Sequence, residues 1–179
     1  MKVYLVCGVI GSGKDFFFKK YKRENPKERI EQLVIANSLR LLASKIYGLD
    51  LLDNATYEAW KEQNRQKLVD LGSNLKDIFG EDILTLGVTN KIKDNQTYIL
   101  TDFRFPAEFF SITETVSLKD ITVVFMNYKS ARYCLKPEQV TERMACWLVA
   151  QGYKDGQEWD YWQFEKVMKR YKEFQFNST

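Results

Sequence analysis

The sequence contains no histidine in its 179 residues. This absence excludes Ser-His-Asp and Cys-His nucleophile systems, histidine general bases and metal sites built from imidazole. Cysteine is scarce as well, since Cys7, Cys134 and Cys146 are widely spaced and form no C-x-x-C pair. That pattern argues against a zinc site or a disulfide framework and favours structural thiols in a reducing compartment. Any catalysis must therefore use carboxylates, lysine, arginine, tyrosine, cysteine or a bound cation.

Long apolar runs are also missing. No run approaches the roughly 20 residues that cross a bilayer, and the apolar opening segment lacks the basic stretch of a signal peptide. The balance of 27 Lys and Arg against 24 Asp and Glu leaves a net charge of only +3, a weak attraction for nucleic acid or membrane surfaces. We expect a cytoplasmic protein, in the host cytoplasm if the chain is viral, that binds neither nucleic acid nor membranes.

The chain does contain four short apolar runs rich in β-forming residues. They predict buried strands at residues 3–7, 30–35, 97–101 and 121–126. Helical spacing predicts helices at residues 14–23, 37–48, 56–79, 83–92 and 105–112. We expect the 56–79 helix to break near Gly72. Strands alternating with helices predict an α/β fold of three layers with a parallel sheet, in one domain over residues 1–179. Its core is expected at about 1–36 and 95–179, and a helical region at about 37–94.

Aromatic residues are abundant, at 15% of the chain. Consecutive phenylalanines in the first predicted helix are expected to pack against the sheet: Phe16, Phe17 and Phe18. Residues 158–174 carry aromatic and basic side chains at helical spacing, which predicts an amphipathic helix that covers the sheet or makes a dimer contact. The tryptophans Trp147, Trp159 and Trp162 are expected in the same core or interface. A homodimer is therefore one of the assemblies that the sequence leaves open.

Residues 8–15, GVIGSGKD, fit the phosphate-loop pattern G-x-x-x-x-G-K between a predicted strand and a predicted helix. Glycines let successive backbone N–H groups turn inward around phosphate oxygens, and the start of the helix adds a positive dipole end. Lys14 supplies a positive charge within reach of β and γ phosphates. The predicted phosphate ligands are Gly8, Gly11, Ser12, Gly13 and Lys14. The alternative is an ordinary glycine-rich turn with an exposed lysine.

Two acidic residues are candidates for Mg²⁺. Asp15 stands where Ser or Thr is usual in the pattern and offers an anionic oxygen, directly or through water, although its charge also suits the first turn of a helix. Asp102 follows a predicted parallel strand, and the carboxyl ends of such strands gather ligands. Arg104 would then present its guanidinium to a phosphate, unless Asp102 and Arg104 simply pair across a turn.

Further basic residues lie elsewhere in the chain. Arg40 lies near the start of a predicted helix, where the dipole disfavours a cation, so an anion is expected nearby. Arg65 sits in a polar stretch, KEQNRQK, that is typical of a solvated helix face. Lys129 and Arg132 follow the 121–126 strand, in a segment that either closes over a nucleotide or forms a basic surface loop.

Three stretches together resemble the phage-type deoxynucleoside monophosphate kinase family, a branch of the P-loop nucleoside-monophosphate kinases. The first is the loop ending in GKD at residues 8–15. The second is ANSLRLLASKIYGLD at 36–50 followed by RQKLVDLGSNLKDIFGED at 65–82. The third and most specific is DFRFPAE at 102–108, similar to the family's D-x-R-F-x-x-E segment. The resemblance covers about residues 1–126.

The resemblance implies transfer of the ATP γ-phosphoryl group to a deoxynucleoside monophosphate, on a parallel-sheet core with a helical substrate-binding insertion and a lid. It implies ATP binding by Lys14 and the loop amides, Mg²⁺ at Asp15 and Asp102, and acceptor or transferring phosphate at Arg40, Arg65 and Arg104. Lys14, Asp15 and Arg104 would be the catalytic residues. The family's lid often carries a histidine beside a Ser/Thr-Glu pair. In this chain the pair Thr141-Glu142 has no histidine beside it. The candidate lid residues are Arg132 and Arg143, and Arg132 is expected to bind ATP.

Such a transfer suits a chain without histidine, because an ionised acceptor phosphate needs no general base. Two alternatives stay open. One is a P-loop kinase for another small phosphorylated acceptor, such as phosphomevalonate. The other is a nucleotide-binding module without transfer activity. A binder of single-stranded nucleic acid that uses the aromatic residues is disfavoured by the near-neutral charge.

Overall fold

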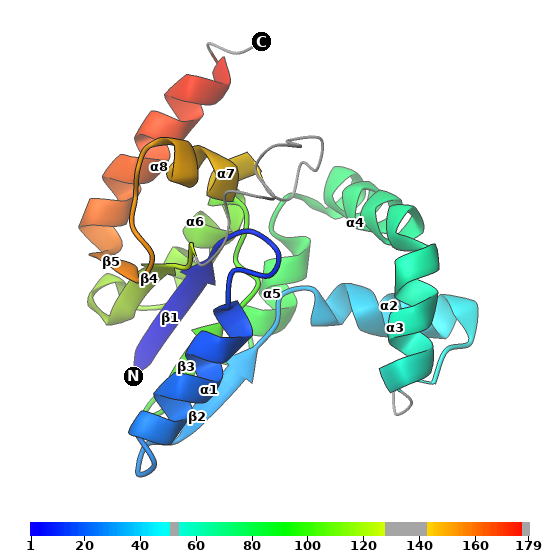
Figure 1. The fold of residues 1–179 in the computed structure, drawn as a ribbon. Helices are drawn as coiled ribbons and strands as arrows, with labels where there is room; N and C mark the ends of the chain where they lie inside the picture. The colour runs from blue at the N-terminus through cyan, green and yellow to red at the C-terminus, as the bar shows by residue number, and fades with distance from the viewer. Residues whose placement is uncertain (51–53, 128–142, 177–179) are drawn as a thin grey trace. The chain divides into compact units, whose positions relative to one another are not determined.

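The computed structural model describes residues 1–50, 54–127 and 143–176 (Figure 1). The chain divides into two compact units. The first comprises Met1–Leu33 and Ile92–Thr179, and the second comprises Val34–Lys91. No helix in the described ranges combines the length and the apolar character that crossing a membrane requires.

A sheet of five strands forms the centre of the first unit, in the order β2-β3-β1-β4-β5. Its strands are β1 (Lys2–Cys7), β2 (Ile30–Leu33), β3 (Thr97–Leu100), β4 (Ile121–Phe125) and β5 (Gln157–Asp160). The first four pair in parallel, as predicted, and β5 pairs antiparallel with β4. In β3 every residue is buried, which is typical of a parallel strand covered on both faces.

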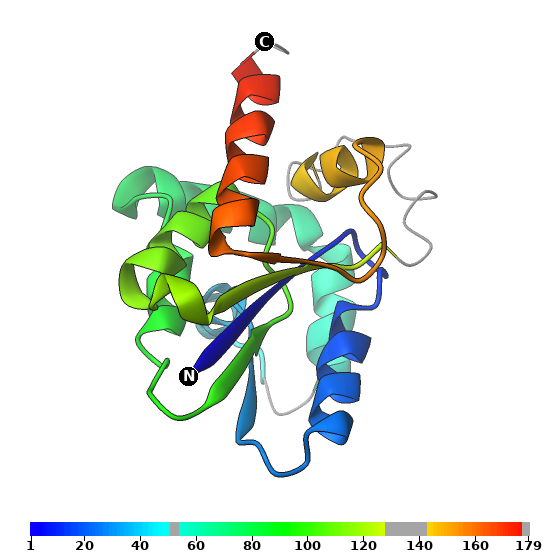
Figure 2. The ribbon, with the colours of Figure 1, turned by 90° about the vertical axis from the view of Figure 1, so that its left-hand side faces the viewer.

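Helices cover both faces of this sheet, which gives the three predicted layers (Figure 2). On one face, Phe17, Phe18 and Tyr21 of α1 (Lys14–Glu24) pack against a buried cluster that includes Val6 and Ile99. The other face is covered by α6 (Pro106–Thr115) and α8 (Tyr161–Phe176). The short η1 (Leu118–Asp120) leads into β4, and α7 (Arg143–Ala150) precedes β5. The sheet is thus buried between apolar helix faces, the largest stabilising contribution in such a fold.

Aromatic rings hold the α6 and α8 layer together. Phe164 of α8 lies 5.1 Å from Phe109 and 5.9 Å from Phe103, measured between ring centroids. It also lies 5.4 Å from Trp159 of β5. Edge-on and tilted rings at these separations add about 0.5–1.5 kcal/mol per pair to the burial of their area.

Two predictions for the helices of the first unit are wrong, the start of the last helix and the position of Phe16. The predicted 158–174 helix starts at Tyr161, because the preceding residues form β5 and bury Trp159. The exposed fraction of Trp162 is 60%, so this side chain lies outside the core, whereas Trp147 is buried. Phe16 is 61% exposed, since three consecutive helical residues span more than half the circumference and cannot all face the sheet.

The second unit consists of helices: α2 (Asn37–Tyr47), α3 (Asn54–Gln63), α4 (Arg65–Phe79) and α5 (Ile83–Thr89). The helix α2 ends at Gly48, whose φ of 64° lies in the left-handed region that favours glycine. The N-cap of α2 is Ala36, without a side-chain hydrogen bond.

The predicted 56–79 helix is two helices, and the predicted break at Gly72 is wrong. The interruption falls at Asn64, whose side-chain Nδ2 donates to the Trp60 carbonyl at 2.9 Å. Gly72 is buried inside α4, and a Cβ there would lie 3.4 Å from Leu39 Cδ2 of α2. The glycine therefore allows close approach of two helices and does not end one.

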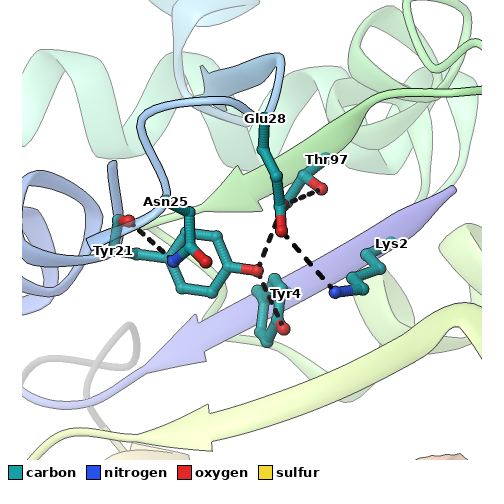
Figure 3. A network of polar contacts seen from close by, with 6 residues as sticks. All are labelled: Lys2, Tyr4, Tyr21, Asn25, Glu28 and Thr97. Carbon is teal, nitrogen blue, oxygen red and sulfur yellow. Dashed lines mark hydrogen bonds and ion pairs between the residues drawn. The ribbon is translucent and has the colours of Figure 1, made fainter. Parts of the chain in front are cut away.

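The amino ends of the strands carry a network of polar side chains (Figure 3). Glu28 Oε2 accepts hydrogen bonds from Tyr21 Oη at 3.4 Å and Thr97 Oγ1 at 3.0 Å, and Glu28 Oε1 lies 3.9 Å from Lys2 Nζ. Tyr21 Oη is also 3.3 Å from Tyr4 Oη. Burial and the neighbouring Tyr4 hydroxyl raise the pKa of Tyr21 well above its usual range.

Candidate functional site

The carboxyl ends of β1 and β3 form a topological switch point. These two strands are neighbours, but β1 continues through α1 on one face of the sheet and β3 continues through α6 on the other. In open α/β sheets, ligands bind at the carboxyl ends of strands whose connections diverge in this way. The residues after β1 and β3 are therefore the candidate site.

The glycine loop, residues 8–14, connects β1 to α1 and depends on backbone conformations that favour glycine. The φ angles of Gly8, Gly11 and Gly13 are 150°, 76° and 96°. At Gly8 space is lacking as well, because a Cβ there would lie 2.3 Å from the Met126 carbonyl oxygen and 2.5 Å from Ser12 Oγ. The loop is thus packed main chain to main chain against the end of β4.

Lys14 folds back over this loop. Its Nζ donates to the carbonyl oxygens of Gly8 at 2.7 Å and Val9 at 2.8 Å. Within the loop, Ser12 N donates to Val9 O at 3.1 Å. The ammonium group is therefore placed at the loop itself, at the first turn of α1, and not extended into solvent.

Two groups beneath the loop are buried. Ser12 Oγ is buried and has no hydrogen-bond partner among the described residues. Cys7, the last residue of β1, is fully buried, and this burial raises the pKa of its thiol to about 12, although the nearby Lys14 acts in the opposite direction. Burial therefore favours the neutral thiol of Cys7 over the thiolate, which is the nucleophilic form.

Asp15 is linked to the ends of two strands. Gln32 of β2 donates from Nε2 to Asp15 Oδ1 at 2.9 Å and to Thr101 Oγ1 at 2.8 Å. Thr101 directly follows β3, so this side-chain contact joins α1, β2 and β3 at the carboxyl edge. The Gln32 amide thus fixes the direction of the Asp15 carboxylate at the first turn of α1.

Asp102 and Arg104 lie in the turn between β3 and α6, and both are partly buried. The turn is held by Glu108, a buried carboxylate whose Oε2 accepts from the backbone N–H groups of Arg104 at 2.7 Å and Phe105 at 3.0 Å. Glu108 thus closes the start of α6 and holds the backbone of the turn next to Thr101.

Within the described ranges, no cluster of three or more Cys, Asp or Glu side chains is placed to hold a metal ion. A Mg²⁺ site needs no such cluster, since Mg²⁺ keeps several waters and often uses only one or two carboxylates together with substrate phosphates. Asp15 and Asp102 at the edge of the sheet are donors of that kind.

Arg40 and Arg65 belong to the second unit. The guanidinium carbon of Arg40 on α2 lies 4.1 Å from the ring centroid of Tyr57 on α3, a cation–π contact. Burial raises the pKa of Tyr57, while the charge of Arg40 acts to lower it. Arg65 is the exposed first residue of α4.

The predicted lid lies mostly outside the described residues. This holds for Lys129, Arg132, Thr141 and Glu142. The predicted structural thiol Cys134 also lies outside the described residues. Arg143 is exposed and begins α7.

The structure therefore brings the five predicted phosphate ligands of the glycine loop together with Asp15, and places Asp102 directly after Thr101 of the same edge. Sequence reasoning missed Gln32 and Thr101. Each is a polar residue in or beside an apolar strand, and their contact spans 69 positions, so the sequence carries no local signal for it.

No family model and no curated protein sequence matches the chain.

Proposed function

We propose that this protein is a kinase that transfers the γ-phosphoryl group of ATP to a nucleoside or deoxynucleoside monophosphate and gives the diphosphate. The observation that carries the proposal is the position of Lys14, whose ammonium lies over the carbonyls of Gly8 and Val9 in a glycine loop between a central parallel strand and a helix. Loops of this sequence pattern and context bind phosphates through backbone N–H groups and the lysine.

The residues at the site fit a nucleoside triphosphate. Glycines line the turn where a phosphate would approach the main chain, and the start of α1 adds the positive end of the helix dipole. The loop would bind ATP, and Lys14 would neutralise charge on the transferred group. Asp15 and Asp102 would hold Mg²⁺, which when bound neutralises phosphate charge.

The absence of histidine favours an acceptor that needs no general base. A phosphate is already ionised near neutral pH, so its oxygen attacks without a general base, in agreement with a chain that has no histidine. The enzyme's own contribution is then positioning and fixed positive charge. Arg104 beside the β3 end would supply a planar donor to the transferring group. The family resemblance assigns the acceptor phosphate to Arg40 and Arg65 as well.

An ADP-release assay across the common nucleoside and deoxynucleoside monophosphates tests this function. We expect ADP formation above the background without acceptor for at least one monophosphate, with the diphosphate formed in equal amount. Phosphomevalonate belongs in the same panel, because activity with it alone would identify the alternative kinase. ATP binding without transfer to any acceptor would contradict the kinase assignment and indicate a nucleotide-binding module.

A further inference from the structure

Gln32 occupies an unusual position for a polar side chain of a strand. It is the third residue of β2, and its register partner in β3 is Ile99, which pairs in turn with Tyr4 of β1. Ile99 and Tyr4 lie on the sheet face that α1 covers, so Gln32 lies on that face too. This placement lets its side chain reach the first turn of α1.

Both contacts of the Gln32 amide have the length of good hydrogen bonds. The Nε2 atom lies 2.9 Å from Asp15 Oδ1 and 2.8 Å from Thr101 Oγ1. An amide nitrogen carries two hydrogens, so it donates to both acceptors at once. The reversed amide would place its carbonyl oxygen against the Asp15 carboxylate, which is repulsive, so the carboxylate itself selects this orientation.

The contact matters because Asp15 is an exposed side chain on a helix turn. Without a partner such a carboxylate samples several rotamers and loses entropy when it is fixed on a metal. Hydrogen bonds from neighbouring residues orient ligand side chains, and their removal commonly weakens metal binding by 10–100-fold.

We propose that Gln32 is a positioning residue that holds the Asp15 carboxylate in place for Mg²⁺, and that Thr101 anchors the Gln32 amide. This inference rests on the proposed function, because it takes Asp15 as a Mg²⁺ ligand of an ATP-binding site. Gln32 itself touches neither metal nor nucleotide; it acts through Asp15.

The Mg²⁺ dependence of the protein tests the proposal. Gln32→Met keeps the side-chain length and removes both donors. We expect the Mg²⁺ concentration for half-maximal turnover to rise about tenfold, the low end of the usual range because Asp15 is exposed, while kcat at saturating Mg²⁺ changes less than about twofold. If Gln32 had only a structural role, the variant would lose stability but would not need more Mg²⁺ for half-maximal turnover.

Gln96→Met is the matched control. Gln96 Nε2 donates to Glu31 Oε2 at 2.9 Å, the same kind of amide–carboxylate bond in the same unit but at the amino end of β3. This variant should keep the wild-type Mg²⁺ dependence. Thr101→Val should shift the dependence in the same direction as Gln32→Met, by a smaller factor, and Thr101→Ser should restore most of that loss because it keeps the hydroxyl.

The outcomes separate this inference from the kinase assignment. Mg²⁺ titrations of ATP binding are therefore run beside the turnover assay. Wild-type ATP binding that depends on Mg²⁺ but yields no product would overturn the kinase, and the Gln32 inference then stands or falls with the shift in Mg²⁺-dependent binding. Unchanged Mg²⁺ dependence in folded Gln32→Met overturns the inference and leaves the kinase intact. Where Gln32→Met does not fold, Thr101→Val decides in its place.

Discussion

The two ends of the parallel strands in the first unit handle their polar groups differently. At the amino end, side chains satisfy one another, since Glu28 accepts from Tyr21 and Thr97 and lies beside Lys2 (Figure 3). At the carboxyl end, the main chain is organised by glycines in left-handed conformations, and a lysine ammonium bonds to its carbonyls. A closed side-chain network mainly adds stability, whereas unusual backbone conformations cluster at functional sites. The proposed site therefore lies at the carboxyl end, and we expect the amino-end network to serve stability.

The largest expected effect is loss of turnover in Lys14→Met. The substitution keeps the length of the side chain but removes the charge at the loop, and loss of one such charge-stabilising donor costs about 10²–10³-fold in kcat. Steady-state kinetics measures it. Lys19→Met, an exposed lysine of the same helix, should leave turnover unchanged. Near wild-type activity of Lys14→Met would contradict the proposal that the site lies at the carboxyl ends of the strands.

The next largest effect is on stability, in Gly8→Ala. Its new Cβ would meet the Met126 carbonyl at 2.3 Å, and the main chain there is held by the bond from Met126 N to Cys7 O at 2.9 Å. We expect a cost of about 3 kcal/mol or more in the free energy of unfolding, measured with urea.

Gly156→Ala provides the comparison for that substitution. Its φ of 73° is also left-handed, but nothing lies within 4 Å of a Cβ there. The cost should be about 1 kcal/mol, from backbone strain alone. Equal costs at the two glycines would show that close packing around Gly8 is not what the loop requires.

Alkaline pH should lower the free energy of unfolding through groups at both ends of the strands, and first through Cys7 at the carboxyl end. The pKa of Cys7 is about 12 in the folded protein and about 9 in the unfolded chain. Above pH 9 the unfolded state therefore binds fewer protons, and stability falls as pH rises, by about 1 kcal/mol by pH 10. Urea unfolding between pH 8 and 10 should show this loss, and Cys7→Ala should lack it. Parallel pH profiles of the two proteins would contradict the assignment.

The smallest effect is expected at the amino end, in Tyr21→Phe. The variant loses the hydroxyl that lies between Tyr4 and Glu28, at a cost of about 1 kcal/mol or less in the free energy of unfolding. Turnover should stay at the wild-type level. A loss of activity with intact stability would mean that the amino-end network also serves the site.

The sequence predicted β1, β3 and β4 because each is a short, mostly apolar run, and burial on both faces requires such runs. For the predicted strand at 30–35 the expected burial is wrong, because β2 has the sequence IEQL and only Leu33 in it is buried. It missed β5, since the QEWD segment buries only Trp159 and carries acidic residues on an edge strand. The adjoining α8 has buried residues at helical spacing, Phe164, Val167, Met168 and Tyr171, and that pattern extended the predicted helix back over β5.

For the candidate site, the pattern of residues 8–15 predicted the loop because glycine and lysine at fixed spacing are a local signal. Gln32 and Thr101 leave no such signal. Their contact depends on β2 and β3 being neighbours in the sheet, and strand order follows from tertiary packing that a single sequence does not encode locally. Asp15 was identified, but the group that orients it was not.

The strand order has a consequence for how the chain is made. Strands β1 and β2 are not neighbours; β3 lies between them. A chain synthesised only as far as residue 96 therefore holds two strands and no partner that can pair them. Until β3 leaves the ribosome, both carry unsatisfied edges, which are liable to wrong pairing. Pairing β2 with the rest of the sheet thus requires the later, four-residue β3, and such non-local pairing should slow the folding of the chain.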